Sequence, residues 1–110
     1  MSVHHISKNA GFETVNLEED RPVSSVFCCD LLSAAMSRAP SGCAWVTIIT
    51  NVNTVAVAIL AEASCIVLAE GYTFDENAVN AARGKITLMR SELPTYETAA
   101  KIDSLLRAAD

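Results

Sequence analysis

The apolar residues of this chain form two kinds of run, which alternate along the sequence. Unbroken runs rich in β-branched residues, such as "CAWVTIIT" and "SCIVLAEG", are typical of strands that are covered on both faces of a sheet. The segments between them have helical spacing instead. In "LLSAAMSRA" (31–39), the apolar positions that share one helical face are Leu32, Ala35, Met36 and Ala39.

Extended over the whole chain, the pattern predicts five strands and five helices. The strands are expected at "FETVNL", 24–30, about 44–50, "SCIVLAEG" and "KITLMRS". The helices are expected at "VHHISKNAG", 31–39, 54–63, "TFDENAVNAARG" and "PTYETAAKIDSLLRAA". Strands that alternate with helices at this spacing imply right-handed parallel crossovers. We therefore predict an α/β fold over residues 1–110, one domain with a mainly parallel sheet of four to five strands and helices on both faces.

Residues 44–61 carry no charged side chain, a length near the lower limit for a membrane span. Asn51 and Asn53 lie in the middle of this stretch, where a bilayer would leave their amides without partners. A strand, a helix with an Asn cap and a second strand fit the same residues better, so no membrane span is expected.

The helix expected at 54–63 is apolar nearly all the way round, whereas an outer helix on a small sheet normally has a polar face. Two explanations remain open. A second copy of the chain covers the helix around Val55–Ala63, which predicts a homodimer, or the helix is packed deeply at the centre of its own layer.

The formal charge is −5, from eight Lys and Arg against thirteen Asp and Glu, with no basic block, so nucleic acid is not an expected partner. The first fifteen residues lack a hydrophobic run of the kind that a secretory signal has, which favours a cytoplasmic protein. The four cysteines are then expected to be reduced and buried. Neither they nor His4 and His5 have ligand spacing, and no metal or cofactor is predicted.

Known catalytic motifs do not fit the chain. The segment "VNAARGK" resembles a phosphate-binding P-loop only at Gly84-Lys85, because Val79 stands where the leading glycine belongs and Ile86 replaces the hydroxyl residue. The patterns G-x-S-x-G, H-E-x-x-H and G-x-G-x-x-G do not occur. The sequence thus predicts a domain that is not an enzyme.

Polar residues follow the predicted strands, at the edge of the sheet where open parallel sheets bind ligands. They are Asp30, Thr50, Asn51, Asn53, Glu70 and Ser91. Because residues 50–53 also open a helix, their free N–H groups are suited to an anion such as a phosphate or carboxylate. The alternative is that Thr50, Asn51 and Asn53 only cap that helix. In the same way, Asp30 would cap the helix expected at 31–39. Both interpretations remain open.

Five segments of the chain, read in order, resemble the DRTGG domain over residues 20–102, namely D-R-x-V, D-L-L-S-x-x-M, A-W-V-T-I-x-T-N, V-A-V-A and C-I-V-L-A-E-G. The chain departs from the motif that names the family, because Asp20-Arg21 is followed by Pro22-Val23-Ser24 without the two glycines. From the residues alone, Asp20-Arg21 is the only oppositely charged pair in a turn-like setting, and most such pairs are solvated and contribute little to stability. If this pair orders the loop into strand 24–30, its role is structural.

The resemblance implies a fold similar to the N-terminal domain of HPr kinase. DRTGG domains occur as small standalone proteins in anaerobic bacteria, inside phosphotransacetylases and between the CBS domains of regulated inorganic pyrophosphatases. We therefore expect a non-enzymatic regulatory or dimerising module that senses a small anionic ligand such as a nucleotide. The alternatives are a small enzyme that uses Asp30 or Glu70 as general acid or base, and a scaffold for a redox or fermentative enzyme.

Overall fold

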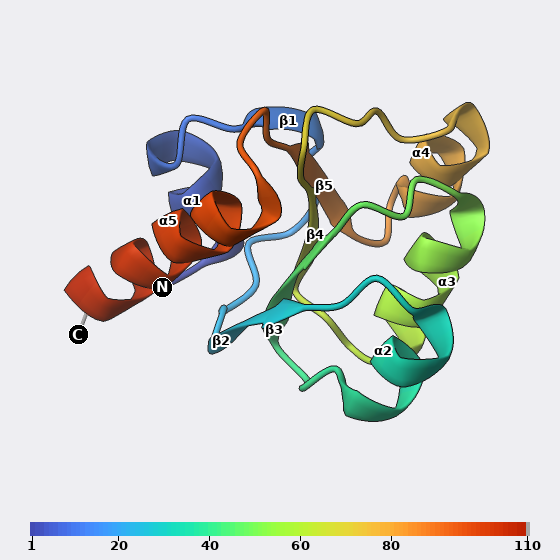
Figure 1. Ribbon diagram of the computed structural model, residues 1–110, viewed down its shortest axis with the longest axis horizontal. Helices are drawn as coiled ribbons and strands as arrows, with labels where there is room; N and C mark the ends of the chain where they lie inside the picture. Colours follow the sequence, from blue (N-terminus) through green and yellow to red (C-terminus); the bar gives the residue numbers. More distant parts are fainter. Residues whose placement is uncertain (110) are drawn as a thin grey trace.

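The computed structural model describes residues 1–109, which form one five-stranded sheet between two layers of helices (Figure 1). In chain order the elements are α1 (Val3–Asn9), β1 (Glu13–Asn16), β2 (Ser25–Cys28), α2 (Leu32–Arg38), β3 (Cys43–Thr47), α3 (Val52–Leu60), β4 (Cys65–Leu68), α4 (Glu76–Ala82), β5 (Thr87–Arg90) and α5 (Thr95–Ala108). Every helix and strand that the sequence pattern predicts is present, with shorter strands than predicted.

The strands lie in the order β1-β5-β4-β3-β2. From β2 to β5 all neighbours are parallel, and β1 pairs antiparallel with β5 at one edge of the sheet. The predicted α/β fold with a mainly parallel sheet is confirmed. This topology places the amino ends of four strands at one edge of the sheet and their carboxyl ends at the other.

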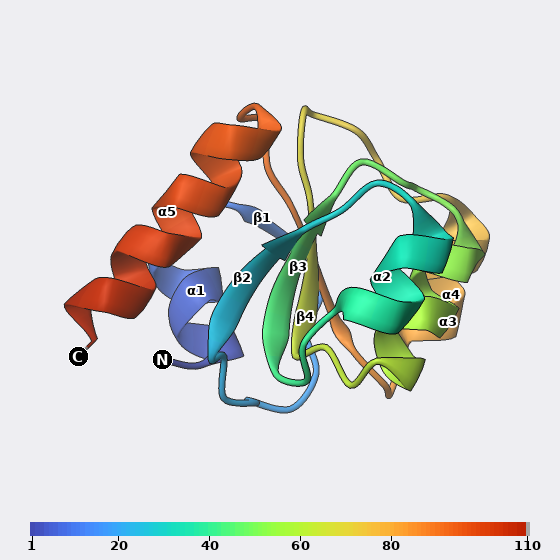
Figure 2. The same ribbon diagram turned by 60° about the horizontal axis from the view of Figure 1, so that its bottom comes forward.

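Helices cover both faces of the sheet, as predicted: α2, α3 and α4 lie on one face, and α1 and α5 on the other (Figure 2). Strand register explains the division, because successive side chains of a strand point to opposite faces. Four side chains in register pack toward α2–α4, namely Phe27, Trp45, Ile66 and Leu88. Those that pack toward α1 and α5 include Val46, Val67 and Met89.

The uncharged stretch 44–61 folds as β3, a short loop and α3. Within residues 1–109, no helix combines the length and the apolar character that a membrane crossing requires. Strand β3 ends at Thr47 rather than near residue 50, because the next amide, that of Ile48, donates its hydrogen bond to the carboxylate of Asp30 at 2.9 Å. Helix α3 correspondingly begins at Val52, before the predicted start at residue 54.

Helix α3 is the middle helix of its layer, between α2 and α4. Val55, Val57 and Ala58 are buried within the domain, as is Ala63 beyond the end of the helix. The outward face is still apolar, since Ile59 is 38% exposed and Leu60 is 71% exposed. Deep packing therefore accounts for one side of the helix, and the segment Val55–Ala63 as a whole is not free to contact a second copy.

The expectation that all four cysteines are buried is wrong for Cys28, which is exposed, and for Cys29, which is half-buried, while Cys43 and Cys65 are fully buried. The difference follows from strand position, because β2 is the last strand of the sheet and has a neighbour on one side only. No alternation of apolar residues distinguishes such an edge strand from a central one.

Candidate functional site

The six predicted ligand residues all follow the carboxyl ends of parallel strands, as the sequence indicates. Asp30 follows β2, and its Oδ1 accepts hydrogen bonds from the Thr47 hydroxyl and the Ile48 amide, both at 2.9 Å. It therefore ties the end of β3 to the end of β2. The suggestion that Asp30 caps α2 is wrong, because the capping position is Leu31, which makes no such side-chain bond.

At the start of α3, Asn51 is the cap, and its Oδ1 accepts a hydrogen bond from the Asn53 amide at 2.9 Å. The carbonyl oxygen of Thr50 accepts from the Asp75 amide at 3.0 Å, which holds the loop before α4. In the part of the chain that the structure describes, the side chains of Thr50 and Asn53 make no hydrogen bond. Asn51 therefore caps α3, whereas the side chains of Thr50 and Asn53 remain available to solvent or a ligand.

Glu70 and Ser91 both form hydrogen bonds with the first residues of α5. The Glu70 carboxylate accepts hydrogen bonds from the amide and the hydroxyl of Thr95. Ser91 is buried, and its Oγ shares a hydrogen bond of 2.9 Å with Thr98 Oγ1 and accepts from the Leu93 amide at 3.0 Å. Both side chains therefore have structural partners within the domain.

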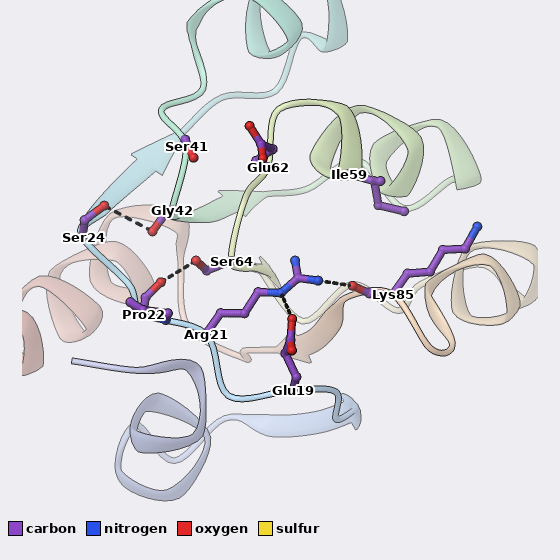
Figure 3. Close-up of a pocket in the computed structure, with 10 residues that line it drawn as sticks. All are labelled: Glu19, Arg21, Pro22, Ser24, Ser41, Gly42, Ile59, Glu62, Ser64 and Lys85. Atoms are coloured by element: carbon purple, nitrogen blue, oxygen red, sulfur yellow. Dashed lines mark hydrogen bonds and ion pairs between the residues drawn. The ribbon is translucent and has the colours of Figure 1, made fainter.

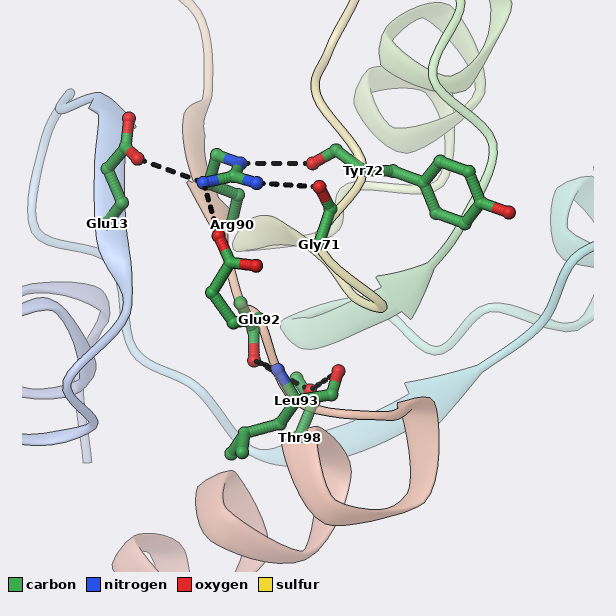
Figure 4. Close-up of polar contacts among 8 residues, drawn as sticks. Glu13, Gly71, Tyr72, Arg90, Glu92, Leu93 and Thr98 are labelled. Atoms are coloured by element: carbon green, nitrogen blue, oxygen red, sulfur yellow. Dashed lines mark hydrogen bonds and ion pairs between the residues drawn. The ribbon is translucent and has the colours of Figure 1, made fainter.

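Arg90, at the end of β5, holds the same edge together and is not marked by any sequence pattern. Its guanidinium donates to the carbonyl oxygens of Gly71 at 2.7 Å and Tyr72 at 3.0 Å (Figure 4). It also forms ion pairs with Glu13 at 3.1 Å and Glu92 at 3.0 Å, with its side chain only 16% exposed. Most polar groups at the carboxyl edge are consequently bonded to one another.

A pocket of about 500 Å³ lies at the opposite edge of the sheet (Figure 3). Its lining residues are Glu19, Arg21, Pro22, Ser24, Ser41, Gly42, Ile59, Glu62, Ser64 and Lys85. Nearly all of them lie just before β2, β3, β4 or β5, so the pocket is built from the loops that lead into the amino ends of the four parallel strands.

Hydrogen bonds between these loops fix the pocket's frame. The Ser24 amide donates to the Gly42 carbonyl at 3.0 Å, and the Gly42 amide donates to the Glu62 carbonyl at 2.9 Å. The Ser64 hydroxyl donates to the carbonyl of Pro22. Gly42 has φ +81°, and a Cβ there would lie 3.0 Å from the Ser24 Oγ, so glycine suits both its backbone and its surroundings.

The pocket is lined by two cations and two carboxylates. Arg21 donates through Nε to Glu19 at 3.0 Å and through Nη2 to the Lys85 carbonyl at 2.9 Å. A guanidinium has five N–H donors, of which these bonds use two, so the remaining three are available to a ligand. Among residues 1–109, the side chains of Lys85 and Glu62 have no hydrogen-bond or ion-pair partner. Such a pocket can bind an anion and a hydrogen-bond donor at the same time.

The residues Asp20 and Arg21 have separate roles. Asp20 Oδ1 accepts a hydrogen bond from the His4 amide at 2.9 Å, which ties the loop to α1 and lowers the pKa of the Asp20 carboxyl. Arg21 points into the pocket and contacts Glu19 instead of Asp20 (Figure 3). The sequence singles out this dipeptide but does not indicate the pocket, because the other lining residues come from distant segments.

No family model matches the sequence, and no curated protein matches it either. One solved structure with a similar fold is the crystal structure of the CBS and DRTGG domains of the regulatory region of Clostridium perfringens pyrophosphatase, complexed with its activator diadenosine tetraphosphate. The TM-score is 0.74 at 16% sequence identity, and the match covers 92% of this chain and 45% of that chain. This chain thus spans less than half of the length of the chain in that structure. At this identity the likeness concerns the fold, and it shows that the chain has the DRTGG-like fold that the sequence motifs imply.

Proposed function

We propose that the chain is a non-enzymatic regulatory domain that binds a small anionic ligand, such as a nucleotide, in the pocket at the amino edge of the sheet. The proposal rests mainly on one observation: the guanidinium of Arg21 lines the pocket, and three of its N–H donors have no partner within the described part of the domain. The pocket volume of about 500 Å³ is in the range of small-molecule sites. Lys85 adds a second positive charge to the lining.

The fold comparison supports the regulatory role and the class of ligand. The similar structure is a regulatory region, and the activator bound to it is a nucleotide. Nucleotides carry several negative charges, which suits a guanidinium with free donors because charge-assisted hydrogen bonds to phosphate are strong and often bidentate.

A catalytic role for the strand-end carboxylates is the weaker alternative. A general acid or base must have its carboxylate within hydrogen-bond reach of a reacting group. Asp30 and Glu70 instead accept hydrogen bonds from backbone amides and hydroxyls of their own domain. Their contacts support a role in holding the strand and helix ends together and not a role in catalysis.

We also propose that the domain forms a homodimer through the outward face of α3. Val52, Ile59 and Leu60 are exposed apolar side chains on that helix. Ile59 lines the ligand pocket as well, so the proposed dimer contact borders the proposed site. A ligand in the pocket would then change the surroundings of a residue at the dimer contact, which gives the domain a means of transmitting ligand binding.

Thermal unfolding with added ATP, AMP or diadenosine tetraphosphate tests the ligand proposal. The wild-type protein should show a rise in melting temperature that grows with ligand concentration. Arg21→Ala should lose this rise, measured from its own ligand-free melting temperature. Arg38→Ala, which removes an exposed cation on α2, is the matched control and should keep it.

The alternative site at the carboxyl edge is tested in the same assay. Asn53→Ala removes an open amide at the start of α3 and should leave the ligand shift unchanged. Loss of the shift in Asn53→Ala together with its retention in Arg21→Ala would place the ligand at the carboxyl edge and reject the pocket.

A further inference from the structure

Among residues 1–109, two that are not glycine have a left-handed backbone, and both are glutamates: Glu62 with φ 60° and Glu70 with φ 64°. This conformation brings Cβ close to the following carbonyl oxygen, so residues other than Gly, Asn and Asp rarely adopt it. A glutamate at such a position is unfavourable for the backbone, and residues in such conformations cluster at functional sites.

Glu70 is explained by its contacts, because its carboxylate binds the amide and the hydroxyl of Thr95 at the start of α5. Glu62 has no such explanation. It is the left-handed residue after α3, where the Glu62 amide donates to the Ile59 carbonyl at 3.1 Å and the Ala63 amide donates to the Ala58 carbonyl at 2.9 Å. These two bonds form a Schellman motif, in which glycine is the usual left-handed residue.

The side chain of Glu62 lines the pocket, and within the described chain its carboxylate has no partner. Figure 3 shows Glu62 on the turn that follows α3, across the pocket from Arg21. The bond from the Gly42 amide to the Glu62 carbonyl holds this turn in place. These backbone hydrogen bonds therefore hold a residue with an unpaired carboxylate at the pocket that the Arg21 guanidinium also lines.

We infer that Glu62 determines which anions the pocket accepts, by accepting a hydrogen bond from a hydroxyl or amino group of a ligand whose phosphate binds Arg21. An ionised carboxylate has acceptors only, and it repels a second anionic group. The pocket then selects nucleotides, which carry sugar hydroxyls and base amino groups beside their phosphates, over inorganic polyphosphate, which offers no such donor. This inference rests on the proposed function and adds the basis of its selectivity.

The test compares ATP with inorganic tripolyphosphate, which has the same number of phosphates, by isothermal titration calorimetry. Wild-type protein should bind ATP more tightly than tripolyphosphate. Glu62→Gln and Glu62→Gly should each weaken ATP binding about tenfold, the loss expected for one hydrogen bond to a charged group. Tripolyphosphate should bind these variants as well as or better than it binds the wild type, because a negative charge has been removed.

Glu62→Gly also separates selectivity from folding. Glycine fits the left-handed position, so the melting temperature of this variant without ligand should rise by a few degrees while ATP binding weakens. If wild type binds ATP and both variants bind it equally well, the inference about Glu62 is overturned and the proposed function stands. If the wild-type protein binds neither ATP nor tripolyphosphate, the inference about Glu62 and the proposed function are both overturned.

Discussion

The carboxylate of Glu70, at the end of β4, accepts hydrogen bonds from the backbone amide of Thr95 at 2.6 Å and from its hydroxyl at 3.1 Å. The capping position of α5 is Pro94, whose side chain has no group that can accept a hydrogen bond. A residue from the turn after β4 thus caps the helix, and its negative charge lies at the positive end of the helix dipole.

Replacing Glu70 by alanine should lower the free energy of unfolding by about 1 kcal/mol, the usual loss on removing a helix cap. Glutamate and alanine both carry a Cβ, so the left-handed backbone at position 70 is equally unfavourable with either residue. The difference in the free energy of unfolding between wild type and Glu70→Ala therefore measures the contribution of the cap. Urea denaturation followed by circular dichroism measures the change. Thr95→Val, which removes the hydroxyl bond and keeps the amide bond, should cost less. Equal stability of Glu70→Ala and wild type would show that the cap contributes nothing.

Arg90 should matter more for stability than any single exposed ion pair. Arg90→Met keeps most of the aliphatic chain but leaves the carbonyls of Gly71 and Tyr72 without their donor. We expect the free energy of unfolding to fall by about 2 kcal/mol, because the partly buried carbonyl of Gly71 and the exposed carbonyl of Tyr72 both lose a hydrogen bond to a charged group. Glu13→Gln removes one charge from the same cluster at a side chain that is 63% exposed, and it should cost less than about 1 kcal/mol. Urea unfolding curves of the two variants and the wild type show which substitution costs more stability. A loss in Glu13→Gln as large as that in Arg90→Met would contradict the prediction.

The sequence pattern predicts the elements and the class of sheet because both depend on local spacing. The runs around Trp45 and Val67 are apolar at every position, as strands buried on both faces must be, and the helices between them have three-and-four spacing. The end of β3 is different. It depends on the Asp30 carboxylate, which is 18 positions before Ile48 in sequence, and no local pattern contains that contact.

The candidate site is less accessible to sequence reasoning for the same reason. The general rule for open parallel sheets predicts a site at the carboxyl edge, and the predicted polar residues do follow the carboxyl ends of the parallel strands. Whether a polar side chain faces a ligand or a helix end depends on its partner, as Glu70 and Glu62 show. The pocket joins loops around Arg21, Gly42, Glu62 and Lys85, which come together only when the sheet has formed.

The proposed dimer contact is tested by Leu60→Glu, which places a charge on a side chain that is 71% exposed. The variant should keep its far-ultraviolet circular dichroism and elute as a monomer, with the mass measured by light scattering. Ala58 is fully buried, so a charge there would disturb folding and would say nothing about assembly. Tyr96→Glu alters an equally open position on α5, across the sheet, and should leave the dimer intact. A Leu60→Glu dimer, or a monomeric wild type, would contradict the proposed contact.

Burial of Cys65 makes the stability of the domain sensitive to alkaline pH. Desolvation raises the pKa of this thiol from 9.0 to about 12, so the folded state keeps the proton that the unfolded state releases above pH 9. The folded state then binds more protons than the unfolded state, and the free energy of unfolding falls as pH rises. As pH rises from 9 toward about 12, this thiol should lower the free energy of unfolding by on the order of 1 kcal/mol per pH unit.

Lysine and tyrosine side chains titrate in the same pH range. The test therefore compares the free energy of unfolding of the wild type with that of Cys65→Ala at each pH. Cys65→Ala is less stable at pH 8, because it leaves a small cavity, but it lacks the titrating thiol. The stability gap between wild type and Cys65→Ala should therefore narrow steadily from pH 9 to pH 10.5, measured by urea denaturation in the presence of a reductant. Since the thiol is the one group that differs between the two proteins, parallel pH profiles would mean that Cys65 ionises as readily in the folded state as in the unfolded chain.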